Sequence, residues 1–248
     1  LLFKEEGINK LNKANVLVVG LGGVGSFAAE FLVRAGVGKM SIVDGDIVDI
    51  TNINRQLPAL HSTVGQPKVK VVGDRLLDIN PELQLTRIEE FLSPERAYEL
   101  VSPEFDYVLD CIDSLTPKMN LIIAAKRKKV KLISNMGAGG KYDAAKVTVR
   151  DISKTEYCPL AKNIRKKLKK VGIDKGIKAV YSAEIPDSKS LKLTDGTNFK
   201  KSFWESFCKT IHLCRFCKIT THGNYTLICF SCSNKTLSKT LADWRLLY

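Results

Sequence analysis

A run of glycines is the part of the chain best suited to bind phosphate. Gly20, Gly22, Gly23 and Gly25 form a G-x-G-x-x-G pattern that follows an apolar stretch at 16–19 and precedes helix-forming residues. Glycines at these positions let the chain turn tightly and let phosphate oxygens approach main-chain N–H groups. The pattern predicts a nucleotide-binding loop, but alone it fits NAD, FAD, S-adenosylmethionine or ATP.

Acidic and cationic side chains downstream narrow the choice of nucleotide. Asp44 follows Gly25 by 19 positions, at the end of the next apolar stretch, where an acid suits a ribose hydroxyl. Arg55 and Lys68 could neutralise the charge that develops when a carboxylate attacks the α-phosphate of ATP. Asp113 ends a later apolar stretch and could hold Mg²⁺ on the phosphates. Arg55 lies in a polar stretch that follows Asp46. An NAD dehydrogenase needs no such polar loop over its nucleotide, so we expect ATP-dependent activation of a carboxylate.

Several of these side chains also have simpler interpretations. Asp113 could cap the helix that follows it, Arg55 could form a surface ion pair, and Asp46 could be a turn residue. Cys111 and Cys158 are expected to be packed thiols rather than nucleophiles.

These residues must be positioned by strands and helices that alternate down to about residue 150. Expected strands cover 16–19, 40–43, 83–88, 105–111, 130–134, 146–151 and 179–184. Expected helices cover 1–13, 27–35 with Ser26 as its N-cap, 68–80, 93–100 with Ser93 as its N-cap, 116–129, and an amphipathic basic helix over 162–178. This order predicts an α/β fold with a doubly wound, mostly parallel, Rossmann-like sheet.

Taken in order, the motifs resemble the ThiF/MoeB/E1-like adenylating superfamily, and within it the tRNA threonylcarbamoyladenosine dehydratases (the TcdA/CsdL group) most closely. The supporting motifs are the glycine loop, D-x-D ending at Asp46, N-I-N-R-Q at 52–56, V-G-Q-P-K at 64–68, C-I-D-S at 111–114, G-A-G-G at 137–140 and V-Y-S-A-E at 180–184. The resemblance covers residues 1–186, which we expect to form an ATP-binding, E1-type adenylation domain.

The resemblance implies an activity and a set of roles. The activity is ATP-dependent dehydration of N6-threonylcarbamoyladenosine at position 37 of tRNA, through carboxylate activation and ring closure. Gly22 and Gly25 would lie under the phosphates, Asp44 would bind the ribose, and Asp113 would be the acid linked to Mg²⁺. The side chains around the triphosphate would be those of Asp46, Asn52, Arg55, Gln56 and Lys68. Family members act as homodimers and are often membrane-associated.

The charge of the chain also points to a polyanionic partner. The 248 residues carry a formal net charge of +13, which is large for an enzyme of small metabolites. We expect tRNA rather than DNA, with the basic helix 162–178 and the run 126–131 as contacts; a solvated lysine-rich surface is the simpler alternative. No apolar run is long enough to span a membrane. The expected location is the cytoplasm, or an organelle (mitochondrion or plastid) in a eukaryote.

Residues 187–248 carry none of the motifs listed above, and we expect them to form a separate basic, cysteine-rich tail. Its cysteines form a C-x₂-C-x₁₁-C-x₂-C pattern that could hold Zn²⁺, with ligands Cys214, Cys217, Cys229 and Cys232. The alternative is a tail altered by splicing or reading frame, with chance cysteines. A second departure is that residues 1–13 lack the arginine that the family carries before its first strand.

Two other functions remain open at this point. One is adenylation of the C-terminus of a ubiquitin-like sulfur carrier, which uses the same ATP site. The other is a catalytically impaired isoform that binds nucleotide or partners through its altered tail.

Overall fold

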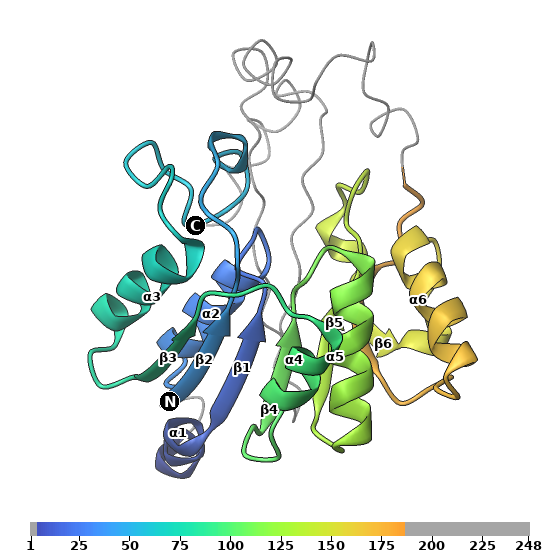
Figure 1. The fold of residues 1–248 in the computed structure, drawn as a ribbon, viewed down its shortest axis with the longest axis horizontal. Helices are drawn as coiled ribbons and strands as arrows, with labels where there is room; N and C mark the ends of the chain where they lie inside the picture. The colour runs from blue at the N-terminus through green and yellow to red at the C-terminus, as the bar shows by residue number, and fades with distance from the viewer. Residues whose placement is uncertain (1–3, 187–248) are drawn as a thin grey trace.

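A seven-stranded sheet forms the centre of the molecule (Figure 1). The computed structural model describes residues 4–186, so the predicted tail domain 187–248 and its four-cysteine zinc site lie outside the described residues. The sheet order is β3-β2-β1-β4-β5-β7-β6. The strands are β1 (Asn15–Val19), β2 (Lys39–Val43), β3 (Gln84–Ile88), β4 (Tyr107–Asp110), β5 (Leu132–Asn135), β6 (Val147–Asp151) and β7 (Lys178–Ser182).

All strand pairs are parallel except β6 with β7, which confirms the predicted mostly parallel, doubly wound sheet. The strand order reverses at β1, which pairs with β2 on one side and with β4 on the other. In such sheets ligands bind in the crevice beyond the carboxyl ends of the strands at the reversal point. The glycine loop, which follows β1 directly, therefore lies at the edge where a nucleotide is expected.

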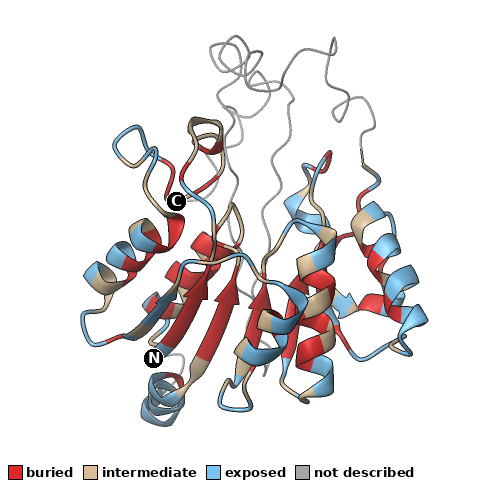
Figure 2. Cartoon of the chain, in the orientation of Figure 1, coloured by how far each residue is buried: buried red, intermediate tan, exposed pale blue. Residues whose placement is uncertain are grey.

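Helices cover both faces of the sheet and bury its central strands (Figure 2). One apolar cluster joins the sheet to α5 (Leu115–Arg127), α6 (Pro159–Lys170) and α4 (Pro94–Leu100). The other joins it to α2 (Gly25–Arg34), α3 (Lys68–Ile79) and, through Leu11, α1 (Lys4–Lys13). Because Leu17 belongs to the first cluster and Val16 and Val18 to the second, β1 is apolar on both faces.

Two local predictions were wrong. Ser26 is not the N-cap of α2: the helix already begins at Gly25, and the Ser26 Oγ donates a hydrogen bond of 2.6 Å to the Gly22 carbonyl. The basic helix predicted over 162–178 ends at Lys170, because Gly172 adopts a φ of 76°, a conformation that terminates helices. The predicted cap of α4 is confirmed, since the Ser93 side chain accepts from the Arg96 N–H.

Within residues 4–186, every helix is too short or too polar to cross a lipid bilayer.

Candidate active site

Close packing explains why the loop after β1 is built from glycines. Gly20 has a φ of +90°, and a Cβ there would lie 2.8 Å from the Cys111 carbonyl oxygen. A Cβ on Gly25 would lie only 1.7 Å from the Gly20 carbonyl oxygen. Gly22 and Gly23 have more room, with nearest atoms at 3.6 and 3.2 Å on the residues facing them. The loop is thus packed tightly beneath the amino end of α2, where helix N–H groups favour a bound anion.

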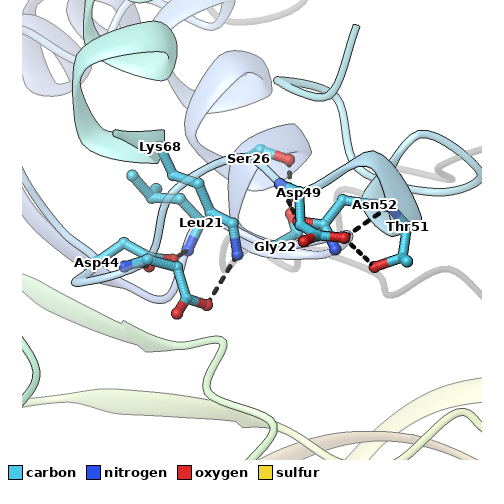
Figure 3. A network of polar contacts seen from close by, with 9 residues as sticks. Leu21, Gly22, Ser26, Asp44, Asp49, Thr51, Asn52 and Lys68 are labelled. Atoms are coloured by element: carbon cyan, nitrogen blue, oxygen red, sulfur yellow. Dashed lines mark hydrogen bonds and ion pairs between the residues drawn. The ribbon is translucent and has the colours of Figure 1, made fainter. Parts of the chain in front are cut away.

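Asp44 connects the end of β2 to the glycine loop. Its Oδ2 accepts a 2.6 Å hydrogen bond from the Leu21 N–H, and its Oδ1 accepts one of 2.8 Å from the Asp46 N–H (Figure 3). Burial raises the pKa of Asp44 above its ordinary value, although both amides and the nearby Lys68 act in the opposite direction. The carboxylate therefore fixes the loop next to the position expected for a ribose.

Lys68 lies at the first position of α3 with its side chain almost completely buried. Its Nζ is 2.9 Å from Oδ2 of Asp46, whose side chain is 54% exposed. The main chains of the same two residues are also joined, since the Lys68 N–H donates to the Asp46 carbonyl at 3.0 Å. A buried ammonium held by a single exposed carboxylate keeps positive charge at the edge of the cleft.

A short 3₁₀ helix, η1 (Ile50–Asn52), orders the polar loop after β2. Asp49 accepts from the Thr51 N–H at 2.8 Å, and Asn52 Oδ1 accepts from the Asp49 N–H at 3.2 Å (Figure 3). The Arg55 and Gln56 N–H groups both donate to the Asn52 carbonyl. This reciprocal capping continues the turn, so Asn52, Arg55 and Gln56 reach the cleft together.

Arg55 has neutral partners among the described residues. Its Nη1 donates to the Thr51 carbonyl at 3.2 Å and to Asn54 Oδ1 at 3.0 Å. Within residues 4–186 it forms no salt bridge, so the surface ion pair considered above is not observed there. Its charge remains available for an anionic ligand.

The predicted side chains surround one cleft with two lobes. The first lobe, about 430 Å³, is lined by the glycine loop, the polar loop, the segment after β3 and the turn after β4. The predicted residues that line this lobe are Gly20, Gly22, Asp44, Asp46, Asn52, Arg55, Gln56, Lys68 and Asp113. Gly23 lines only the second lobe, and Gly25 lines neither, because it packs against Gly20 inside the loop.

The second lobe, about 370 Å³, opens from the first past Arg55 and Asp113. Its far wall is the second glycine-rich loop, Gly137–Gly139, with Leu160 at the start of α6. The cleft therefore has room for a nucleotide and for a second group beside it.

Asp113 is an exposed carboxylate at the junction of the two lobes. Among the described residues it has no hydrogen-bond or ion-pair partner, and the N-cap of α5 is Ser114, so the capping interpretation of Asp113 is wrong. An unpaired carboxylate beside a phosphate loop suits Mg²⁺, which usually binds one or two carboxylates together with phosphate oxygens. No group of three or more potential metal ligands gathers within residues 4–186.

The sequence analysis missed a fully buried ion pair at the turn that carries Asp113. Lys118 Nζ lies 2.7 Å from Asp110 Oδ2, and Ser134 Oγ donates to the same oxygen. The other oxygen, Oδ1, accepts from the Ile112 N–H at 3.2 Å. The available signal was Asp110 itself, because an acid that ends a buried strand requires a partner.

Similarity to known proteins indicates both a family and a kind of enzyme. The ThiF family model matches residues 1–236. The tRNA threonylcarbamoyladenosine dehydratase of Bacillus subtilis is 46% identical over 182 residues (73% of this chain and 72% of the relative), and that of Escherichia coli is 40% identical over 190 residues (74% and 71%). The crystal structure of the E. coli enzyme in complex with ATP superposes with a TM-score of 0.73 at 39% identity, covering 75% of this chain and 80% of that one.

Molybdopterin-synthase adenylyltransferase of Salmonella typhimurium is less similar, at 38% identity over 156 residues (63% of this chain and 61% of the relative). The superposition on the E. coli enzyme agrees with the fold described above, and the family model matches most of the chain. The chain belongs to the ThiF family.

Proposed function

We propose that this protein is an ATP-dependent tRNA threonylcarbamoyladenosine dehydratase. The observation that carries the proposal is the cleft, which gathers two cations and an unpaired carboxylate around a phosphate loop: Lys68, Arg55 and Asp113. The names of the B. subtilis and E. coli relatives, and the ATP bound in the E. coli structure, support this assignment.

The reaction begins with carboxylate activation. A carboxylate oxygen of the threonylcarbamoyl group attacks the α-phosphorus of ATP, an acyl–phosphate bond forms, and pyrophosphate leaves. Both reactants are anionic, so Arg55 and Lys68 stabilise the charge that accumulates on the phosphates. A second atom of the same group then attacks the acyl carbon, closing a ring and releasing AMP and a proton. The net loss from the modified base is one water.

The nucleotide is positioned by the first lobe. Gly22 and the amino end of α2 cradle the phosphates, and Asp44 receives the ribose hydroxyls. Asn52 and Gln56 flank the phosphates. Asp46 holds Lys68 in place when no nucleotide is bound. Asp113 would hold Mg²⁺, which when bound supplies positive charge to the phosphates.

The adjacent second lobe suits the modified base and its carboxylate. It meets the first lobe at Asp113 and Arg55, so a carboxylate there would face the α-phosphate. We infer that tRNA is the macromolecular partner. A homodimer and membrane association stay predictions from the resemblance. A zinc site in the tail, the division at residue 186 and a cytoplasmic or organellar location stay predictions from the sequence.

Carrier adenylation, the rival activity, would use the same first lobe. The adenylyltransferase relative matches a smaller share of this chain than the dehydratases do, so carrier adenylation is the second candidate. The two activities differ in the acceptor, so only a substrate assay separates them.

The direct test is mass analysis of nucleosides from tRNA that carries threonylcarbamoyladenosine, after incubation with the protein, ATP and Mg²⁺. We expect the modified nucleoside to lose one water in the presence of ATP. Lys68→Ala should abolish the loss, whereas Lys70→Ala, an exposed lysine on the same helix, should retain it. ATP binding without water loss in the native protein would contradict the proposal and favour carrier adenylation or an impaired isoform.

A further inference from the structure

A basic hollow lies at the edge of the sheet opposite the ATP cleft. It has a volume of about 650 Å³ and is lined by the first residues of three strands, Tyr107, Leu132 and Lys178. In Figure 1 this is the edge at the bottom of the view, where the strand arrows begin. Its walls also include the carboxyl end of α5 and Gly176, in the loop between α6 and β7.

Four lysines and no acid line this hollow: Lys126, Lys129, Lys131 and Lys178. Two acids adjoin the residues that line the hollow, and main-chain N–H groups donate to both. Asp106 accepts from the Asn15 N–H at 2.8 Å, and Asp151 accepts from the Gly176 N–H at 2.6 Å. The four positive charges are therefore not balanced by a carboxylate in the hollow.

Two of the lysines have neutral partners, and two are available for a ligand. Lys126 Nζ donates to the Gly176 carbonyl at 3.4 Å, and Lys178 Nζ donates to the Tyr107 hydroxyl at 3.1 Å. Lys129 and Lys131 are exposed and have no side-chain partner among the described residues. These two ammonium groups are therefore available to an anion in the hollow.

The backbone at Lys129 is strained in a way that a glycine would relieve. Lys129 has a φ of 58° and follows the end of α5, where its N–H donates to the Lys126 carbonyl and the Val130 N–H donates to the Ala125 carbonyl. This is a Schellman motif, in which the left-handed position is usually glycine. A lysine there costs stability but supplies a charge to the hollow. Strain of this kind often accompanies a functional residue.

The position of the hollow indicates a long anion. The ATP cleft lies beyond the carboxyl ends of the strands and the hollow lies at their amino ends, roughly 10–15 Å apart for strands of this length. Exposed lysines of α6 lead toward the loop that lines the hollow: Lys162, Lys166, Lys167, Lys169 and Lys170. Lys175, also exposed, lies in that loop. A polymer with regularly spaced charges could occupy the hollow while its modified base reaches the cleft.

We propose that the hollow binds backbone phosphates of the tRNA, with Lys129 and Lys131 as the principal contacts. The identity of the RNA rests on the proposed function. Phosphate contacts position a nucleic acid without reading its sequence, so the hollow would orient the tRNA while the cleft selects the modified base.

The test measures tRNA binding and turnover for Lys129→Gln/Lys131→Gln. The control of equal charge is Lys70→Gln/Lys146→Gln, two exposed lysines that line neither the hollow nor the cleft. We expect the hollow variant to weaken tRNA binding on the order of tenfold and to lower the slope of log K against log salt by about 1–2 units. Its KM for tRNA should rise while kcat at saturating tRNA stays unchanged. The control pair should resemble the native protein.

Lys129→Gly separates binding from folding. It should preserve or raise the thermal midpoint, because it relieves the left-handed strain, and it should still weaken tRNA binding. If the hollow variant and the control pair bind tRNA equally while the native protein dehydrates it, the hollow is not the RNA site and the proposed function stands. If native tRNA binding depends on Lys129 and Lys131 but no water is lost, the RNA site stands and the proposed function fails.

Discussion

Lys118 and Asp110 form a completely buried ion pair, 2.7 Å between Nζ and Oδ2, at the turn that carries the proposed magnesium ligand. The other oxygen of the same carboxylate, Oδ1, accepts from the Ile112 N–H, one residue before Asp113. Lys118 is on α5 and Asp110 ends β4, so the pair fixes the turn between these two elements. Removing either partner alone would leave an uncompensated buried charge, at a cost of about 3–5 kcal/mol.

Paired substitutions test whether this ion pair positions Asp113. Asp110→Asn/Lys118→Met removes both charges but keeps an oxygen that can accept from Ile112. Asp110→Leu/Lys118→Met removes the acceptor as well. We expect the Leu variant to have a kcat about tenfold lower than the Asn variant, with a similar KM for ATP. The Leu variant differs in losing the hydrogen bond from the Ile112 N–H, which holds the turn that carries Asp113. Equal kcat values in two variants of similar thermal midpoint would assign the pair to folding alone.

The local motifs were predictable from the sequence, and the ion pair was not. The local motifs depend on residues that are neighbours in the sequence. Their spacing therefore places each one at the end of a strand or the start of a helix, as for the glycines, Asp44 and Lys68. The partner of Asp110 is on the following helix, and Ser134 is opposite it on the next strand, in a register that only the assembled sheet defines. The end of the basic helix was missed because one exposed glycine, Gly172, outweighed the apolar spacing.

Asp113 can be tested without disturbing the fold, because it is exposed and its side chain has no hydrogen-bond or ion-pair partner among residues 4–186. Asp113→Asn should leave the thermal midpoint within about 1 °C and lower kcat at least 100-fold, since the amide binds Mg²⁺ poorly. Steady-state assays at several Mg²⁺ concentrations would measure this. Asp174→Asn, an exposed acid outside the cleft, is the matched control. Partial recovery at high Mg²⁺ is expected, and an unchanged kcat would exclude Asp113 from the reaction.

Two glycines of the phosphate loop should behave differently when replaced by alanine. Gly25→Ala would place a Cβ 1.7 Å from the Gly20 carbonyl oxygen, so we expect a loss of several kcal/mol of stability. Gly22→Ala has its nearest neighbour at 3.6 Å, the Nε2 of Gln56, and should fold normally. It should nevertheless weaken ATP binding, because its methyl group faces the lobe that receives the phosphates. Thermal unfolding and ATP titration separate the two effects, and normal ATP affinity in Gly22→Ala would place the phosphates elsewhere.

Glu30 predicts how the stability of the nucleotide lobe depends on pH. This buried carboxylate of α2 accepts from Arg75 of α3 at 2.6 and 3.2 Å, and from Arg34 at 2.8 Å. Burial alone would raise the pKa of Glu30, but the hydrogen bonds and charges of Arg75 and Arg34 together lower it below 4.5. Because the pKa is lower in the folded state, the pair stabilises the protein above the unfolded pKa and loses this contribution as the pH falls through the folded one.

Glu30→Gln should therefore lower the free energy of unfolding by about 1 kcal/mol at pH 7, since both arginines are half exposed. The difference from the native protein should shrink as the pH falls through the lowered pKa of Glu30, because protonated Glu30 resembles glutamine. Denaturant unfolding at pH 7, 5, 4 and 3 would measure it. Glu6→Gln, which breaks an exposed pair with Lys10 on α1, should change little at any pH. A Glu30→Gln difference that is constant with pH would mean that packing, and not the ion pair, joins α2 to the helix that carries Lys68.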